Sequence, residues 1–131
     1  MERNEKTRAL LAAFGCALAY LLAGKVLTAV LPQVPEEAAR MWAFVHRCTA
    51  APIVEELVFR GAIQQLARPL GERQAVALQA VLFAVQHRGP AGMAYALVCG
   101  LVLGTIRSRT GSVWPGMLLH TLNNLLVFAA G

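Results

Sequence analysis

Glu55-Glu56-Leu57-Val58-Phe59-Arg60 places two adjacent carboxylates and a guanidinium inside a long apolar segment. Charged side chains at the depth of a lipid bilayer are costly and usually functional. This stretch is therefore the first candidate for chemistry. It also decides the fold, because the rest of the chain must surround these charges with apolar helices.

The composition indicates an integral membrane protein. The 131 residues are 57% hydrophobic and 15% charged, with a mean hydropathy of +0.55. Soluble domains have roughly 45–50% apolar and about 25% charged residues. A chain of this length holds about five membrane-crossing helices of roughly 20 residues each, and this leaves no room for a separate soluble domain. We expect one membrane domain over residues 1–131.

The charge and the cysteines exclude several other classes of function. The net charge is +5, but the basic residues are scattered and are not interleaved with aromatic residues, so a nucleic-acid partner is not indicated. Cys16, Cys48 and Cys99 are far apart in apolar surroundings. They indicate small buried side chains, and neither a disulfide framework nor a thiolate zinc site.

Five apolar segments are separated by helix-breaking stretches. They lie at about residues 9–31, 41–67, 74–87, 92–106 and 115–130. Their runs are too long and unbroken for a transmembrane barrel, and a helix satisfies its backbone groups within lipid. The predicted fold is all-α, a polytopic transmembrane helix bundle with about five membrane segments around a buried polar site. Residues 1–40 would form an N-terminal anchor helix and its loop.

Basic residues near the segment ends predict that the amino terminus is inside and the carboxyl terminus outside. With this topology the cytoplasmic flanks carry seven basic residues and the opposite flanks three. The seven are Arg3, Lys6, Arg8, Arg68, Arg73, Arg107 and Arg109, and the three are Arg40, Arg47 and Arg88. The start also resembles a signal peptide, but its apolar run continues past Ala17-Leu18-Ala19 to Gly24 and favours an uncleaved anchor. The expected location is a bacterial-type plasma (inner) membrane.

Three pairs of residues share a spacing of four, which places each pair on one helical face. They are Glu56 with Arg60, Phe83 with His87, and His120 with Asn124. Each pair can point into the same interior from a different segment. Glu55 lies about 100° around the helix from Glu56, so the two carboxylates are expected to have different surroundings.

These residues predict a hydrolytic site that faces a scissile carbonyl. Glu56 is expected to stay ionised as a structural clamp with Arg60, because an unpaired buried charge costs far more than a paired one. Glu55 has no obvious partner, and its burial makes it the candidate general base. His87 would share in activating a water, and His120 and Asn124 would donate hydrogen bonds to a developing oxyanion.

Each residue taken alone has a structural alternative. Histidine and asparagine often form hydrogen bonds between membrane helices. Phe83 would be a packing residue, and Trp114-Pro115 would be an interfacial anchor followed by a helix start. His46 has no partner at helical spacing. The joint occurrence of the three pairs on successive apolar segments favours a site.

The motifs as a set carry a family resemblance. They are Glu55-Glu56-Leu57-Val58-Phe59-Arg60-Gly61, Phe83-Ala84-Val85-Gln86-His87, and the run from Gly111 through Trp114-Pro115 to His120 and Asn124. In these stretches the chain resembles the CPBP family (CAAX protease and bacteriocin-processing, also called Abi), intramembrane endopeptidases related to the type II CAAX prenyl endopeptidase. The resemblance covers about residues 48–130, the expected catalytic core.

The resemblance implies a catalytic set of Glu55, Glu56, Arg60, His87, His120 and Asn124. It implies that the first glutamate and first histidine activate water, while the later histidine and asparagine stabilise the oxyanion. Family members commonly have several helices before the Glu-Glu motif, whereas here there is room for one. A homo-oligomer or a partner subunit is therefore plausible, and prenylated substrates of the eukaryotic relatives are not carried over.

Two further questions stay open at the level of sequence. Glu55, His87 and His120 could bind zinc, but a helical His-Glu-x-x-His pairing is absent and Arg60 would oppose a divalent cation, so no cofactor is favoured. A non-catalytic immunity or scaffold protein of the same fold is the main alternative to a protease. A small transporter with a carboxylate relay would leave His120 and Asn124 unexplained. The expected substrate is a peptide or protein with a membrane-associated segment.

Overall fold

The helical fold is confirmed by the structure, a computed structural model that describes residues 2–131. No strand occurs among these residues. The long helices are α1 (Glu2–Val30), α2 (Glu36–Val45), α5 (Glu72–Ala84), α6 (Gly89–Thr110) and α7 (Trp114–Ala130). The shorter elements are the π-helix η1 (His46–Ala50), α3 (Ala51–Glu55), the π-helix η2 (Glu56–Ile63), α4 (Gln64–Leu66) and the 3-10 helix η3 (Arg68–Leu70).

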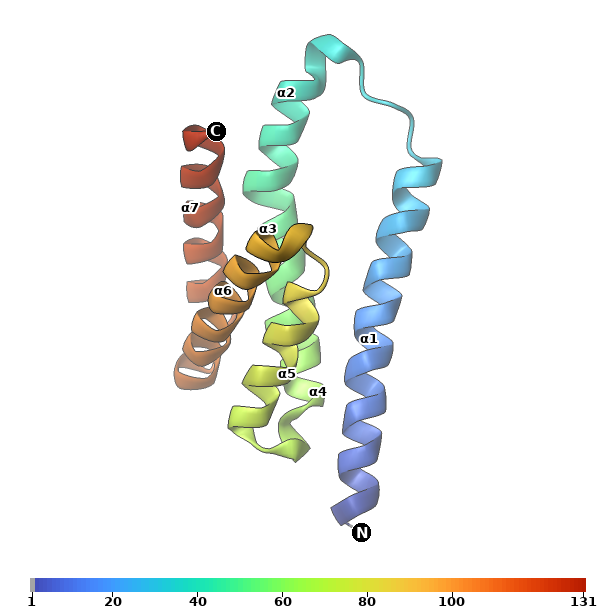
Figure 1. The fold of residues 1–131 in the computed structure, drawn as a ribbon, viewed down its shortest axis with the longest axis vertical. Coiled ribbons are helices and arrows are strands. Elements are labelled where there is room, and N and C mark those ends of the chain that lie inside the picture. The colour runs from blue at the N-terminus through green and yellow to red at the C-terminus, as the bar shows by residue number, and fades with distance from the viewer. Residues whose placement is uncertain (1) are drawn as a thin grey trace.

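The second apolar segment forms one continuous helical path from α2 to α4 (Figure 1). It begins at Glu36, earlier than the predicted segment, because Glu36 and Glu37 stabilise the amino end of a helix directly after Pro35. At η1 and η2 the helix is wider, because its hydrogen bonds span five residues, as in a π-helix. Pro52 explains the first widening, because proline has no N–H to donate and its ring crowds the preceding helical turn.

The third segment ends sooner than its hydropathy suggests. α5 ends at Ala84, and the predicted segment continues to residue 87. The amides of Gln86 and His87 bond back to carbonyls only three residues earlier, and Gly89 then has a φ of 72° ahead of Pro90. Glycine is suited to this left-handed conformation. His87 therefore lies in a turn, and Figure 1 places that turn part-way along the length of α1.

α5 and α6 pack closely through small residues. A Cβ added at Gly100 would lie 2.9 Å from the Cα of Ala80, and one at Gly104 would lie 3.1 Å from a methyl of Val76. This small-x3-small pattern lets two helix backbones approach each other. The Gln79 amide donates to the carbonyl of Gly100 at 2.8 Å, which adds a buried hydrogen bond to the contact.

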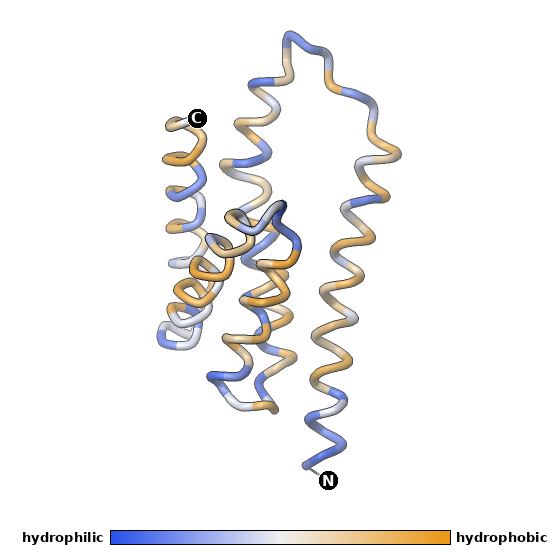
Figure 2. Tube along the Cα trace, viewed as in Figure 1, coloured by the Kyte–Doolittle hydropathy of each residue, from blue (hydrophilic) through white to orange (hydrophobic). Residues whose placement is uncertain are grey.

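α1 contacts η2, η3, α4 and α5 through an alanine face, because Ala9, Ala13 and Ala17 are buried. Its large apolar residues face outward; Leu11, for example, is 69% exposed. Figure 2 shows hydrophobic colour along the middle of α1 and hydrophilic colour at its amino end and at the α1–α2 connection. α1 and α6 are both long and apolar enough to cross a membrane.

Candidate active site

Glu56 is the buried centre of the polar cluster. It is the first residue of η2, and it is 1% exposed. Its Oε1 lies 3.0 Å from Arg60 Nη1 and 2.9 Å from His120 Nδ1. The predicted pairing of Glu56 with Arg60 is therefore present. Glu56 Oε1 thus contacts both Arg60, in the same helical path, and His120 of α7.

His120 connects the two glutamates. Its Nδ1 faces Glu56, and its Nε2 lies 3.5 Å from Glu55 Oε2. With Glu56 ionised, Nδ1–H donates to that carboxylate, and this leaves Nε2 directed at Glu55. The sequence suggested no partner for Glu55, and the structure differs here because α7 brings a histidine to it.

Glu55 and Glu56 have different surroundings, as their positions around the helix predicted. The Glu55 side chain is 20% exposed, whereas the Glu56 side chain is 1% exposed. Glu55 is within electrostatic range of His120, His87 and Arg60 as well as of Glu56. It is thus the carboxylate that a water or a substrate can reach.

Phe83 forms the apolar wall of this cluster. The Arg60 guanidinium carbon lies 4.4 Å from the centre of the Phe83 ring. The rings of His120 and His87 meet Phe83 edge-to-face at centroid distances of 5.8 and 4.7 Å. One aromatic ring thus contacts the arginine and both histidines, and a cation over such a ring is stabilised in a dry site.

His87 reaches the cluster from the turn after α5. Its Nδ1 lies 3.0 Å from the Phe83 carbonyl, and its side chain is partly exposed. If Nδ1 carries the proton and donates to that carbonyl, Nε2 is free to accept a proton. The Phe83–His87 spacing does bring the two rings together, although His87 has left the helix.

The Asn124 side chain has hydrogen-bond partners outside the other five predicted residues. Its Nδ2 donates to the carbonyl of Arg47 at 2.8 Å, which ties α7 to η1. The neighbouring Asn123 accepts a hydrogen bond from the Tyr95 hydroxyl of α6. His120 and Asn124 share one helix, as expected, but in this structure their side chains have separate partners.

Two residues near the site carried no signal in the sequence. Gly116 lies at the start of α7, and a Cβ there would approach Glu56 Oε2 to 2.7 Å. Tyr20 of α1 packs edge-to-face on Phe59 and is within electrostatic range of Glu55. The spacing of four that marks the other residues occurs within one segment, and it cannot reveal contacts between segments.

The three residues considered as zinc ligands are not gathered as a ligand set. Across residues 2–131, no group of three or more His, Cys, Asp or Glu side chains has the arrangement needed to hold a metal ion. Glu55 and His120 face each other, and His87 Nδ1 faces a carbonyl.

Comparison with known proteins gives one family. The family model described as "Rce1-like: Type II CAAX prenyl endopeptidase Rce1-like" matches residues 37–126. The matched range runs from α2 into α7 and contains all six predicted site residues. No curated protein and no solved structure gave a match.

Proposed function

Because the chain belongs to the type II CAAX prenyl endopeptidase Rce1-like family, we propose that it is an intramembrane endopeptidase that cleaves a peptide bond near a membrane-associated segment of its substrate. The family is a membrane-embedded protease family. The observation that carries the proposal is the buried chain Glu55–His120–Glu56–Arg60 inside an apolar helical fold. Ionisable groups at such depth are expensive and are typically retained for function.

Glu55 and His87 activate the water in the proposed mechanism. The Glu55 carboxylate takes a proton from a water while the oxygen of that water bonds to the carbonyl carbon of the scissile peptide. The carbonyl π electrons move to the oxygen and form a tetrahedral oxyanion. Collapse of this intermediate breaks the C–N bond, and the proton taken by Glu55 passes to the leaving amine, directly or relayed through His87 Nε2. The half-buried position of Glu55 supports this role.

His120 and Asn124 stabilise the oxyanion in this proposal. His120 does this in its doubly protonated form, with Nδ1–H donated to Glu56 and Nε2–H directed toward Glu55, where the reaction would occur. Asn124 takes part only after its amide leaves the Arg47 carbonyl. Substrate that binds between α7 and η1 would break the hydrogen bond to the Arg47 carbonyl and free the Asn124 amide.

Glu56 and Arg60 act as positioning residues. Glu56 accepts a hydrogen bond from His120 Nδ1–H and thereby sets the direction of the ring. Arg60 neutralises Glu56 and packs on Phe83. Neither residue needs to touch the substrate.

We propose that hydrolysis proceeds without a metal ion. The support is the guanidinium of Arg60 beside Glu56, which opposes a divalent cation. A zinc-dependent version of the same protease is the competing possibility. Cleavage that continues in a strong chelator supports the metal-free reaction, and cleavage that stops in chelator and returns with added zinc contradicts it.

The proposed arrangement in the membrane is a five-segment bundle with the amino terminus inside, in a bacterial-type plasma (inner) membrane. The support is the excess of basic residues at one set of segment ends, together with the two helices long enough to span. A second copy or a partner subunit would complete the substrate entrance beside α1. The non-catalytic scaffold stays as the alternative that the next experiment tests.

The experiment compares peptides released by the wild-type protein and by Glu55→Gln, identified by mass spectrometry of new amino termini in membranes. Glu5→Gln, an exposed glutamate near the start of α1, is the matched control. New termini with wild type and with Glu5→Gln, but not with Glu55→Gln, support the protease. Identical peptide profiles for all three proteins would contradict it and favour the scaffold.

A further inference from the structure

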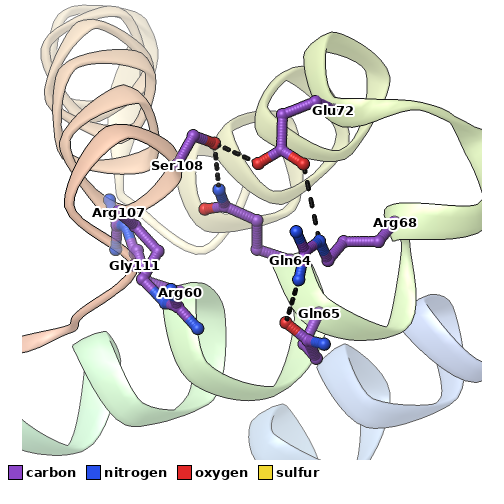
Figure 3. A pocket seen from close by; sticks show the side chains of 8 residues that line it. All are labelled: Arg60, Gln64, Gln65, Arg68, Glu72, Arg107, Ser108 and Gly111. Atoms are coloured by element: carbon purple, nitrogen blue, oxygen red, sulfur yellow. Dashed lines mark hydrogen bonds and ion pairs between the residues drawn. The ribbon is translucent and has the colours of Figure 1, made fainter.

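A polar cavity shares only Arg60 with the candidate active site. Its volume is about 370 Å³, and Figure 3 shows it between α4, α5 and the carboxyl end of α6. Ligand pockets commonly measure about 300–1,000 Å³. The lining that matters here is Arg60, Gln64, Arg68, Glu72, Arg107 and Ser108.

Arg60 lines this cavity and carries buried donors without hydrogen-bond partners. Its side chain is 0% exposed, and one guanidinium nitrogen is ion-paired with Glu56. That pair lacks hydrogen-bond geometry, and none of the three Arg60 side-chain nitrogens has a hydrogen-bond partner among residues 2–131. Buried donors without partners are costly, which points to a ligand that accepts from them.

Arg107 adds a second cation with an open hydrogen-bonding position. Arg107 and Arg60 both line the cavity (Figure 3). The Arg107 Nε is buried and has no partner in the described part of the chain. Two guanidinium groups that face one cavity repel each other unless an anion lies between them.

The other side-chain donors and the carboxylate of the cavity have partners, whereas the buried Gln64 Oε1 has none among residues 2–131. Arg68 Nε lies 3.4 Å from Glu72 Oε2, and Ser108 donates to the same carboxylate. The Gln64 amide donates to Ser108 and to the Gly104 carbonyl. This network consumes the one carboxylate of the lining, so Arg60 and Arg107 are left for a ligand.

We propose that this cavity binds a phosphate group, from a lipid headgroup or from a free phosphate. The guanidinium fork matches phosphate oxygens in a bidentate geometry. The cavity lies toward the end of the molecule that holds the amino terminus and the turn from η3 to α5 (Figure 1). In the proposed topology this is the cytoplasmic surface, where anionic lipid headgroups are found.

The test measures binding to delipidated protein in neutral detergent, so it does not depend on peptide cleavage. One arm titrates sodium phosphate against sodium chloride at matched ionic strength and follows thermal unfolding. The other arm adds phosphatidylglycerol and counts bound lipid by native mass spectrometry. Saturable binding in the first arm identifies free phosphate as sufficient, and saturable binding in the second arm alone identifies a lipid headgroup. No saturable binding in either arm overturns the proposal.

The matched variants are Arg107→Gln and Arg109→Gln. Arg109 is exposed on the same helix and does not line the cavity. Loss of one charged hydrogen-bonding partner is expected to weaken binding by about tenfold or more in Arg107→Gln, with little change in Arg109→Gln. Equal weakening in both variants would show a general charge effect and overturn the proposal.

Glu72→Gln keeps the test decisive if Arg107→Gln does not fold. It removes the one negative charge of the lining, and Glu72 is exposed. Phosphate or lipid should then bind more tightly than to the wild-type protein. Unchanged or weaker binding would count against the phosphate site.

Discussion

At the scale of single residues, Glu56 holds the cluster together. Its Oε1 contacts Arg60 and His120, and its Oε2 lies against the start of α7 beside Gly116. The carboxylate is almost fully buried, so its stability depends on these partners. Glu55 is more exposed and has only the longer contact with His120.

Replacement of Glu56 or Arg60 should therefore damage the fold as well as activity. Either Glu56→Ala or Arg60→Ala leaves one buried charge without its partner, and we expect the free energy of unfolding to fall by roughly 3–5 kcal/mol. Denaturant unfolding in detergent measures this loss. Glu55→Ala is the control, and it should lose activity with little loss of stability. Unchanged stability in all three variants would mean that the pair is not a clamp.

Asn124 gives the second prediction at this scale. If its amide donates to the oxyanion, Asn124→Ala should lower kcat by about a hundredfold to a thousandfold and change KM little. Single-turnover cleavage in detergent measures the effect. Because the amide also bonds to the Arg47 carbonyl, unfolding of the same variant must be followed.

Asn123→Ala is the comparison for this prediction. It removes the hydrogen bond from Tyr95, so it reports the cost of losing a contact between α6 and α7 without loss of the proposed donor. Similar kcat values for Asn123→Ala and Asn124→Ala would argue against an oxyanion role.

At the scale of elements, the two glutamates of the candidate site lie where an α-helix passes into a π-helix. Glu55 ends α3 and Glu56 begins η2, so the helix changes its hydrogen-bond pattern between them. π-helical turns in a longer helix occur frequently at functional sites. The Arg47 carbonyl of η1 accepts a hydrogen bond from the Asn124 amide, and this bond connects η1 to α7.

The contact between α5 and α6 gives a prediction about packing. Gly100→Ala would place a methyl 2.9 Å from the Ala80 Cα, so one helix must shift, at a cost of roughly 1–3 kcal/mol. α5 carries Phe83, so activity should fall as well. Thermal unfolding and cleavage rates measure both effects.

Gly15→Ala is the matched control for this substitution. No atom lies within 4 Å of its added Cβ, and alanine favours the helix by up to about 1 kcal/mol. It should be neutral or stabilising. Equal stability of the Gly100→Ala and Gly15→Ala proteins would show that the close approach of α5 and α6 is not needed.

At the scale of the whole molecule, the path of the chain bears on topology. Figure 1 places the two termini toward opposite ends of the molecule. α5 is short, and the turn that follows it lies part-way along α1.

The topology prediction is that the amino terminus is inside and the carboxyl terminus outside. Cysteines placed singly at positions 4 and 130, in a protein lacking Cys16, Cys48 and Cys99, should be labelled from opposite sides of intact cells or vesicles. Labelling of both from one side would contradict this topology and mean that one segment, α5 or α6, does not make the crossing assigned to it.

The sequence by itself determined the helical class, the Glu56–Arg60 pair of the candidate site and the family. The apolar runs indicated an all-helical fold, and the spacing of Glu56 and Arg60 predicted their ion pair, because residues four apart share a helical face. The motif set also indicated the family that the comparison found. These features are local in the chain, and helical periodicity is enough to reveal them.

Only the tertiary structure decided which residues His120 contacts and which buried donors have no hydrogen-bond partner. The bridge from His120 to both glutamates joins residues 64 positions apart, and it depends on the packing of α7 against η2. The turn at Gly89 moves His87 off its helix, and the Arg47 carbonyl holds Asn124. Arg60 and Arg107, which carry buried donors without hydrogen-bond partners, line a shared cavity. Periodicity orients a side chain around its own helix. The approach of neighbouring helices and the choice of rotamers then decide what that side chain contacts.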